Sequence, residues 1–291
     1  MRNIPMTTAT EGRNVLRPET GVTSLSHATD SRDKSYWEGR LASQWGLQGV
    51  GYLGHGVSYN NWLYAVRRQI LRRHLAGLSI SLSEANVLDI GSGTGFWLEQ
   101  WKSLGVRSLK GTDIAAVAVE RLKQTFPEME IMQLDIGEHL ERLDWSGRFD
   151  VVSAFDVLFH ITEDDRFQRA IGNISSLLKQ GGHFFFSDNF VHRTAQRSDH
   201  QVSRSLKEIE AIVRTSGFRI VRRAPMFILM NAPIDSSSRW PMLAWRAFLA
   251  PVHFAHFLGS VYGALLYPVE LMLTRLMSES PTTEMMICQK D

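Results

Sequence analysis

The sequence predicts an α/β fold in which seven strands form a doubly wound, mostly parallel sheet with helices on both faces. Beyond residue 86, short apolar runs alternate with amphipathic segments of helical period, which is the pattern of a parallel sheet covered on both sides. A glycine-rich turn at 91–95 follows the first apolar run and opens the first of these helices. Hydrophobic residues make up 44% of the 291 positions, so the chain can bury a sizeable core.

Residues 1–30 precede this pattern and are rich in threonine, serine, arginine and asparagine, without the apolar run of a signal peptide. We expect a disordered tail there. Residues 31–80 are expected to form an N-terminal helical cap, with helices over 33–47 and 61–78 and a loop over the glycine-rich stretch 46–56.

The predicted helix 61–78 carries four arginines beside its apolar stripe, namely Arg67, Arg68, Arg72 and Arg73. Such a cluster can bind phosphate groups, but a run of charges on a helix more often forms a solvated face. We therefore assign these arginines to a solvated face.

The core is expected to span 81–230 and to be completed by 283–291. Its strands are predicted at 87–90, 108–112, 131–134, 151–155, 183–187, 219–224 and 285–288, the last of them antiparallel. Its helices are predicted at 96–104, 115–125, 164–178 and 205–216. The third helix is expected to stop at Gly181-Gly182, because glycine adopts a left-handed conformation at little cost.

The interval between the last two predicted strands is too long for an ordinary connection, so we expect residues 231–282 to form an apolar helical insertion. Its apolar stretch 248–273 has the length of a membrane span. Pro251, Pro268 and Glu270 interrupt that stretch, and such residues favour a buried or surface-docked helix pair over a span.

Charge and cysteine content restrict the classes of function. Lys and Arg number 32 and Asp and Glu 30, a net charge of +2, which gives no reason to expect a nucleic-acid partner. The single cysteine, Cys288, excludes an internal disulfide framework and a multi-cysteine zinc site, and is consistent with a reducing, cytoplasmic location. The histidines show no metal-ligand spacing, so no metal is expected.

The stretch 87–96, VLDIGSGTGF, carries the central motif. Its glycines allow a tight turn and let a ligand approach the backbone. Phe96 stands where the dinucleotide fingerprint requires glycine, and the chain has no Tyr-x-x-x-Lys pair. A Rossmann-type NAD-dependent oxidoreductase or epimerase is therefore the less favoured alternative. Asp89, one residue inside the strand end, suits a ligand that carries an ammonium group and a sulfonium.

Three further positions follow consecutive strands. Asp113 lies 24 residues after Asp89, close to the spacing at which a carboxylate accepts ribose hydroxyls. Asp135 follows the third strand and is placed to accept a hydrogen bond from the exocyclic amine of adenine. The stretch 149–160, FDVVSAFDVLFH, ends at the switch point of the sheet, where ligands bind in open α/β folds. Each acid alone has a helix N-cap or a solvated loop as its alternative.

Taken together, this succession resembles the class I S-adenosylmethionine-dependent methyltransferases, particularly their small-molecule group, over about 86–222 and the last strand. The resemblance implies a Rossmann-like sheet and S-adenosyl-L-methionine as cofactor. It includes 155–160 and the Lys-Gln-Gly-Gly-His turn at 179–183. The implied cofactor-binding residues are Tyr36, Trp37, Asp89, Gly91, Gly93, Gly95, Asp113, Ile114, Asp135, Ile136, Phe155 and Asp156.

The resemblance also implies which part of the cofactor each of these residues binds. Asp89 and the glycines would hold the methionine part of the cofactor, Asp113 the ribose, and Asp135 with Ile136 the adenine. Tyr36-Trp37 resembles an aromatic pair that closes over the cofactor, with core packing as the alternative.

Methyl transfer is an in-line displacement, so such an enzyme aligns donor and acceptor and needs a base only if the acceptor carries a proton. His160 is the first candidate for the base, because it follows the fourth strand on the cofactor side. His192 is the second candidate and His200 the third, both after the fifth strand. A packing or capping role is the alternative for each histidine.

The insertion bears on the acceptor and on partners. Its aromatic residues are Trp240, Trp245, Phe248, Phe254, Phe257, Tyr262 and Tyr267. This is more aromatic surface than the cover of a small polar metabolite requires, so we expect a small, lipophilic or membrane-presented acceptor, methylated on oxygen rather than nitrogen or carbon. The alternatives are a homodimer through 240–277, and an inactive, membrane-docked protein that only binds S-adenosylmethionine.

Overall fold

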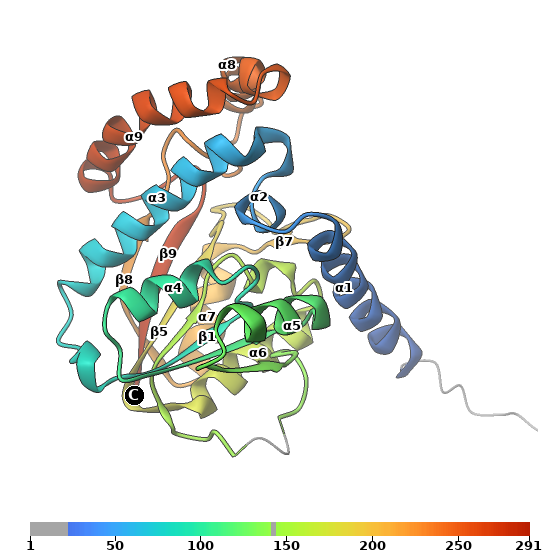
Figure 1. The fold of residues 1–291 in the computed structure, drawn as a ribbon, viewed down its shortest axis with the longest axis vertical. Helices are drawn as coiled ribbons and strands as arrows, with labels where there is room; N and C mark the ends of the chain where they lie inside the picture. The colour runs from blue at the N-terminus through green and yellow to red at the C-terminus, as the bar shows by residue number, and fades with distance from the viewer. Residues whose placement is uncertain (1–22, 141–143) are drawn as a thin grey trace, which may run out of the picture.

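The computed structural model describes residues 23–140 and 144–291 (Figure 1). Most of the predicted tail, residues 1–22, lies outside the described part. From Thr23 onward the prediction of a tail is wrong, because α1 (Thr23–Ser43) already begins there. The stretch from Thr23 to Arg32 holds no glycine or proline that would break a helix.

The predicted loop over 46–56 is also wrong in part, since it contains α2 (Leu47–Val50) and the 3-10 turn η1 (Leu53–His55) ahead of α3 (Gly56–Leu75). Arg40 of α1 holds this stretch by donating to the carbonyl oxygens of Gly49 and Gly51, both at 2.6 Å. The Asn60 side chain of α3 bonds the backbone N–H and carbonyl of Tyr52. These side chains satisfy backbone groups that a glycine-rich stretch would otherwise leave to water.

Seven strands form the predicted sheet in the order β3-β2-β1-β4-β5-β9-β8 within the described residues. Their bounds are β1 Asn86–Ile90, β2 Ser108–Asp113, β3 Glu130–Gln133, β4 Phe149–Ala154, β5 Leu178–Asp188, β8 Phe218–Pro225 and β9 Glu284–Lys290. β1 to β5 run parallel to one another, and β9 is antiparallel to β5 and β8. The predicted Rossmann-like fold is confirmed.

Helices cover both faces of this sheet. α3 and α4 (Phe96–Ser103) pack with alternate strand residues such as Val87 and Phe185 on one face, and α5 (Ala116–Thr125) lies beside α4. α6 (Asp164–Leu177) and α7 (Leu206–Thr215) pack with Leu88 and Phe184 on the other. The alternation follows from the two-residue period of a strand, and it leaves the carboxyl ends of the parallel strands open.

The predicted stop of α6 at Gly181-Gly182 is wrong. The helix ends at Leu177 and β5 starts at once with Leu178, which pairs with Phe149. The ammonium group of Lys179 lies 2.7 Å from Asp150 and ties this early strand to β4. Gly181 does have a left-handed φ of 74°. It adopts this conformation inside β5, however, at the point where the pairing of β5 with β4 shifts register.

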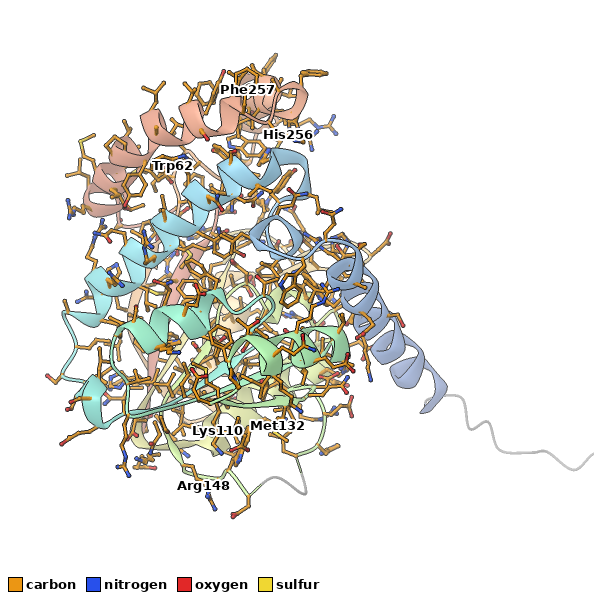
Figure 2. The ribbon with its side chains drawn as sticks, in the orientation of Figure 1. Trp62, Lys110, Met132, Arg148, His256 and Phe257 are labelled. Atoms are coloured by element: carbon orange, nitrogen blue, oxygen red, sulfur yellow. The ribbon has the colours of Figure 1, made fainter. Side chains whose placement is uncertain are left out.

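The insertion folds into α8 (Trp240–Phe254) and α9 (Leu258–Leu276), and α9 lies alongside α3 (Figure 1). Gly263 lets α9 approach α3 closely, since a Cβ there would lie 2.0 Å from the Trp62 ring, and Figure 2 shows Trp62 between the two helices. Among the described residues, no helix combines the length and apolar character needed to cross a membrane. A short hairpin that the sequence did not predict, β6 (Gln196–Arg197) and β7 (Val202–Ser203), follows β5.

Glu270 of α9 anchors the insertion from inside and provides a test of stability. Its buried carboxylate accepts from the backbone N–H groups of Ile228, Leu229 and Met230. Glu270→Leu should lower the free energy of unfolding by roughly 2–4 kcal/mol, because buried amides would lose their acceptor. Chemical denaturation measures this loss of free energy, provided that the m-values of the variant and the native chain are equal.

Glu270→Gln is the matched control, since it keeps one acceptor oxygen and nearly the same volume and should cost less than Glu270→Leu. A leucine variant as stable as the native chain would show that these amides are satisfied in another way.

Candidate functional site

A first cavity opens at the carboxyl ends of β1, β2 and β4, and its empty space is about 920 Å³ with the open solvent at its mouth included. Ten of the predicted site residues line it, namely Trp37, Gly91, Gly93, Asp113, Ile114, Asp135, Ile136, Phe155, Asp156 and His160. The predicted Tyr36, Asp89, Gly95 and His192 do not line it.

Two glycines of the turn after β1 serve different purposes. Gly93 has a φ of 54° and its N–H donates to the Asp113 carboxylate at 2.8 Å. A Cβ on Gly93 would lie 2.8 Å from Val50 across the cavity, so the absence of a side chain keeps this space open. A Cβ on Gly95 would instead lie 2.7 Å from Phe126, so Gly95 permits the packing of α4 on α5 rather than contact with a ligand.

Asp89 is fully buried beneath the turn. Ser153 donates to one carboxylate oxygen at 2.6 Å and in turn accepts from the Trp101 indole at 2.9 Å. The other oxygen of Asp89 has no hydrogen-bond partner among the described residues, and burial raises the pKa of this carboxyl to about 7. A buried acid with an unused acceptor needs a donor or a positive charge, which fits an ammonium-bearing ligand at the adjoining turn.

Asp113 at the end of β2 is held rigidly. Its two oxygens accept from the N–H groups of Gly93 at 2.8 Å and Ala115 at 2.9 Å, and burial raises its pKa to about 6. Each carboxylate oxygen keeps a second acceptor site. Because the residue lines the cavity, these two sites can accept a pair of vicinal hydroxyls.

Asp135 has a partner that sequence reasoning missed. Arg166 of α6 is buried, lines the first cavity and donates to Asp135 at 2.5 Å, while the Gly137 N–H donates to the other oxygen at 2.9 Å. Arg166 also lies 3.7 Å from Asp33 of α1. These contacts fix the orientation of Asp135 at the adenine end predicted from the sequence. In the sequence, Arg166 looks like an ordinary polar residue in the first turn of a helix.

A second cavity adjoins the first. Trp37, Val50, Asp156 and His160 line both. The remainder of its wall comes from Arg40, 51–54, Asn60, Leu63, Arg67, Phe159, Asn189, His200, Gln201, Asn231, Ala232, Ile234 and Thr283. A group passed between occupants of the two cavities would therefore move past the four shared residues.

Asp156, one of the shared residues, is held by a dense set of contacts. It has a left-handed φ of 59°, which a residue other than glycine adopts only at a cost. Ser187 donates to its carboxylate at 2.9 Å and accepts from its N–H at 2.7 Å. Arg67 lies 2.8 Å from the other oxygen. Strain of this kind, held at a cavity, favours a functional position.

Arg67 corrects the assignment of the α3 arginines to a solvated face. It is buried, with its guanidinium 4.8 Å from the ring centres of both Tyr64 and Phe227. Arg73 also bonds α9, through the Leu271 carbonyl oxygen at 3.2 Å. Of the four arginines, only Arg68 and Arg72 are exposed. The charge pattern of a helix did not show that one arginine has an acidic partner about ninety residues away.

His160 has a defined tautomer. Its Nδ1 lies 2.8 Å from the main-chain oxygen of His200, and because a carbonyl only accepts, Nδ1 carries the proton. Nε2 of the neutral ring then has a free lone pair. Burial lowers the pKa of His160 to about 4, so the ring is neutral at pH 7. The hairpin β6–β7 supplies the orienting carbonyl.

The two remaining histidine candidates lie in different surroundings. His200 lines the second cavity and stacks on the Tyr36 ring, with centres 4.9 Å apart. His192 lines neither cavity. It is 45% exposed and bonded to Asp235 at 2.6 Å, a contact that raises its pKa. The structure therefore does not bring His192 together with His160, because Asp235 holds its side chain at the surface.

Comparison with known proteins adds to this geometry. A family model described as a methyltransferase domain matches residues 62–223, more than half of the chain. The ubiquinone biosynthesis O-methyltransferase of Coxiella burnetii (strain RSA 493) is 30% identical over 112 residues, a match that covers 37% of this chain and 45% of that protein. The enzyme of the same name from Rhodopseudomonas palustris (strain HaA2) is 25% identical over 183 residues, 56% of this chain and 68% of the relative. The chain thus spans about half the length of the Coxiella relative.

Solved structures share the fold. A methyltransferase from Leishmania major that uses S-adenosylmethionine superposes with a TM-score of 0.58 at 15% identity, over 90% of this chain and 83% of that one. Magnesium protoporphyrin IX methyltransferase from Synechocystis PCC 6803, with bound S-adenosylmethionine, gives a TM-score of 0.53 at 15% identity, over 90% and 97%. At such identities the likeness concerns the fold alone.

Proposed function

The chain belongs to the methyltransferase domain family, and on this premise we propose that it is an S-adenosylmethionine-dependent enzyme that methylates a hydroxyl oxygen of a small lipophilic acceptor held in the second cavity. One observation carries the proposal. His160 lines both cavities and has an unprotonated Nε2. An O-methyltransferase acting on a hydroxyl needs a proton acceptor at this border, whereas an aligned, uncharged amine does not.

The first cavity holds the cofactor, which when bound supplies a methyl group on a sulfonium centre. Asp113 receives the ribose hydroxyls, and Asp135 with Ile136 forms the adenine end. Asp89 lies beneath the turn and does not line this cavity, so it would act on the ammonium group of the methionine part through its charge. Each of these acids is positioned by contacts within the chain before the ligand arrives, so little ordering remains to be done on binding.

His160 takes the proton in this reaction. Nε2 would accept the proton of the acceptor hydroxyl as the methyl group that the cofactor supplies is transferred to that oxygen. Burial is the largest influence on the pKa of His160 and lowers it, whereas the bond to the His200 carbonyl oxygen and, to a smaller extent, the Asp156 charge raise it. Trp37 packs edge-on against the ring at 4.7 Å and helps to exclude water from the border of the cavities.

The second cavity favours an acceptor with an apolar body. Val50, Leu63, Phe159 and Ile234 supply apolar wall, and Asn189 and Asn231 supply amides that can orient hydroxyls. The names of the Coxiella and Rhodopseudomonas relatives support a hydroxylated, quinone-related ring of this description. We therefore infer a hydroxylated aromatic ring with a lipophilic substituent as the acceptor class.

The test is transfer of labelled methyl groups to a series of dihydroxybenzenes with alkyl chains of increasing length, beside hydrophilic catechols and aromatic amines. We expect the highest kcat/KM for a chain-bearing phenol. Methylation of amines alone, or of hydrophilic phenols alone, would refute the acceptor class. Tight cofactor binding without turnover on any acceptor would favour a protein that binds S-adenosylmethionine but is inactive.

Ile234→Trp tests, in the same assay, whether the acceptor and the cofactor occupy different cavities. Ile234 lines only the second cavity, so the larger ring should lower kcat/KM for the phenol about tenfold or more by occupying acceptor space. Cofactor affinity, measured by calorimetry, should stay within about twofold, because Ile234 does not line the first cavity. An equal loss of both would show that the assignment of the cavities is wrong.

A further inference from the structure

The outer surface of α8 and α9 carries an unusual number of exposed apolar side chains, and we call it the α8–α9 face. Phe254 is 91% exposed and Phe257 72%, and Figure 2 shows Phe257 at the edge of the molecule, pointing away from the sheet. Trp240, Leu265 and Leu276 are similarly exposed. Aromatic residues of this size are seldom left in water, and a contiguous apolar patch marks an interaction surface.

The charges on this face have one sign. Arg239, Arg246 and Arg275 are exposed, whereas Glu270, the one acid between 239 and 276, is buried against the backbone of 228–230. Exposed apolar rows flanked by arginines fit the interface of an anionic phospholipid bilayer. A two-fold contact with a second copy would bring the same arginines together and is less favourable.

The face is continuous with the second cavity. Gly54, in the wall of that cavity, packs so closely on His253 that a Cβ would lie 2.7 Å from the imidazole. Gly56 approaches His256 at a corresponding 2.8 Å. Phe254, the last residue of α8, follows His253, and Phe257 follows His256, so two of the three most exposed aromatic residues adjoin the wall of the acceptor cavity. No residue of α8 or α9 lines either cavity, so the pair borders the acceptor site without covering it.

We propose that the α8–α9 face docks on the surface of an anionic phospholipid bilayer and that the acceptor cavity thereby opens at the lipid interface. The docking is inferred from the α8–α9 face alone, whereas the delivery of a lipophilic acceptor rests on the proposed function. Phe254 and Phe257 insert among the acyl chains near the headgroups, and the arginines contact the phosphates.

Co-sedimentation with vesicles tests the docking on the full chain. Phosphatidylcholine vesicles that contain phosphatidylglycerol should bind it, and pure phosphatidylcholine should bind it far less. The double variant Phe254→Ser/Phe257→Ser should lose at least about tenfold in partition coefficient. The variant Arg246→Gln/Arg275→Gln should lose roughly 25-fold on anionic vesicles, about fivefold for each arginine, and high salt should reproduce this loss.

Trp45→Ser is the matched control. Trp45 is 40% exposed but lies between α1 and α2, with its ring 4.9 Å from the Arg121 guanidinium, so its removal should leave vesicle binding unchanged. Equal binding of the native chain and the phenylalanine variant would overturn the proposal. So would a native dimer that this variant dissociates in sedimentation velocity, because the face would then be an interface between copies.

Turnover measured without vesicles distinguishes a failure of the membrane docking from a failure of the proposed function. On a short-chain, water-soluble phenol, Phe254→Ser/Phe257→Ser should match the native kcat/KM, while on a long-chain phenol in anionic vesicles it should fall. If no phenol is methylated at all, the proposed function fails and the vesicle result still decides the docking.

Discussion

Asp113→Ala is expected to weaken the binding of S-adenosylmethionine by roughly 10²- to 10⁴-fold, because two hydrogen bonds to a carboxylate are each worth about 1.5–3 kcal/mol. The same change removes the acceptor for the N–H groups of Gly93 and Ala115. The turn that shapes the first cavity would then lose its fixed geometry. Calorimetric titration at pH 7.5 with S-adenosylmethionine and S-adenosylhomocysteine measures the loss.

The pH dependence of this binding has a definite sign. Burial raises the pKa of Asp113 to about 6, so the carboxylate is ionised at pH 7.5 and becomes protonated as the pH falls through that value. A protonated carboxyl is a weaker acceptor. Cofactor affinity should therefore fall between pH 7 and 5 in the native chain, and this part of the pH dependence should be absent from Asp113→Ala.

Asp150→Ala is a matched control for the substitution itself. Asp150 lies near the start of β4, where it pairs with Lys179, and it lines neither cavity. Its variant should bind the cofactor within about twofold of the native chain. An Asp113→Ala protein that is folded by circular dichroism and binds within threefold of native would contradict the role assigned to this acid.

The strands and the glycine turn could be predicted because their signals are local. Alternating burial of neighbours such as Val87 and Leu88 follows from strand geometry, and the turn needs glycine wherever a ligand or a helix approaches the backbone. The same local logic placed Asp113 at the cavity. Asp89 shows its limit, because the sequence does not tell whether an acid at a strand end lines a cavity or lies beneath it.

The features that could not be predicted depend on partners far away in the chain. Arg67 and Arg166 resemble surface arginines until α3 and α6 are set against Asp156 and Asp135. The tautomer of His160 depends on the main-chain oxygen of His200, in a hairpin whose strands are two residues long. Such short strands carry too little periodicity to be recognised.

His160→Gln is expected to lower kcat by about 10²- to 10⁴-fold, the usual contribution of a positioned general base. Glutamine is similar in length and has no group that accepts a proton at neutral pH. Cofactor affinity should change far less, because none of the acids assigned to ribose or adenine is removed. His192→Gln is the control, and it should keep kcat within about twofold, since His192 lines neither cavity.

The pH profile identifies the base independently of the loss in rate. Burial lowers the pKa of His160 to about 4, so Nε2 stays unprotonated as the pH falls from 7 to 5. A histidine with the ordinary pKa of about 6.5 would be mostly protonated at pH 5.5, with a loss of about tenfold in kcat/KM. Measured at saturating cofactor, which removes the effect of Asp113, the native enzyme should show no such loss. Asp235 raises the pKa of His192 above its ordinary value, so a decline centred above pH 6.5 that disappears in His192→Gln would instead assign the base to His192.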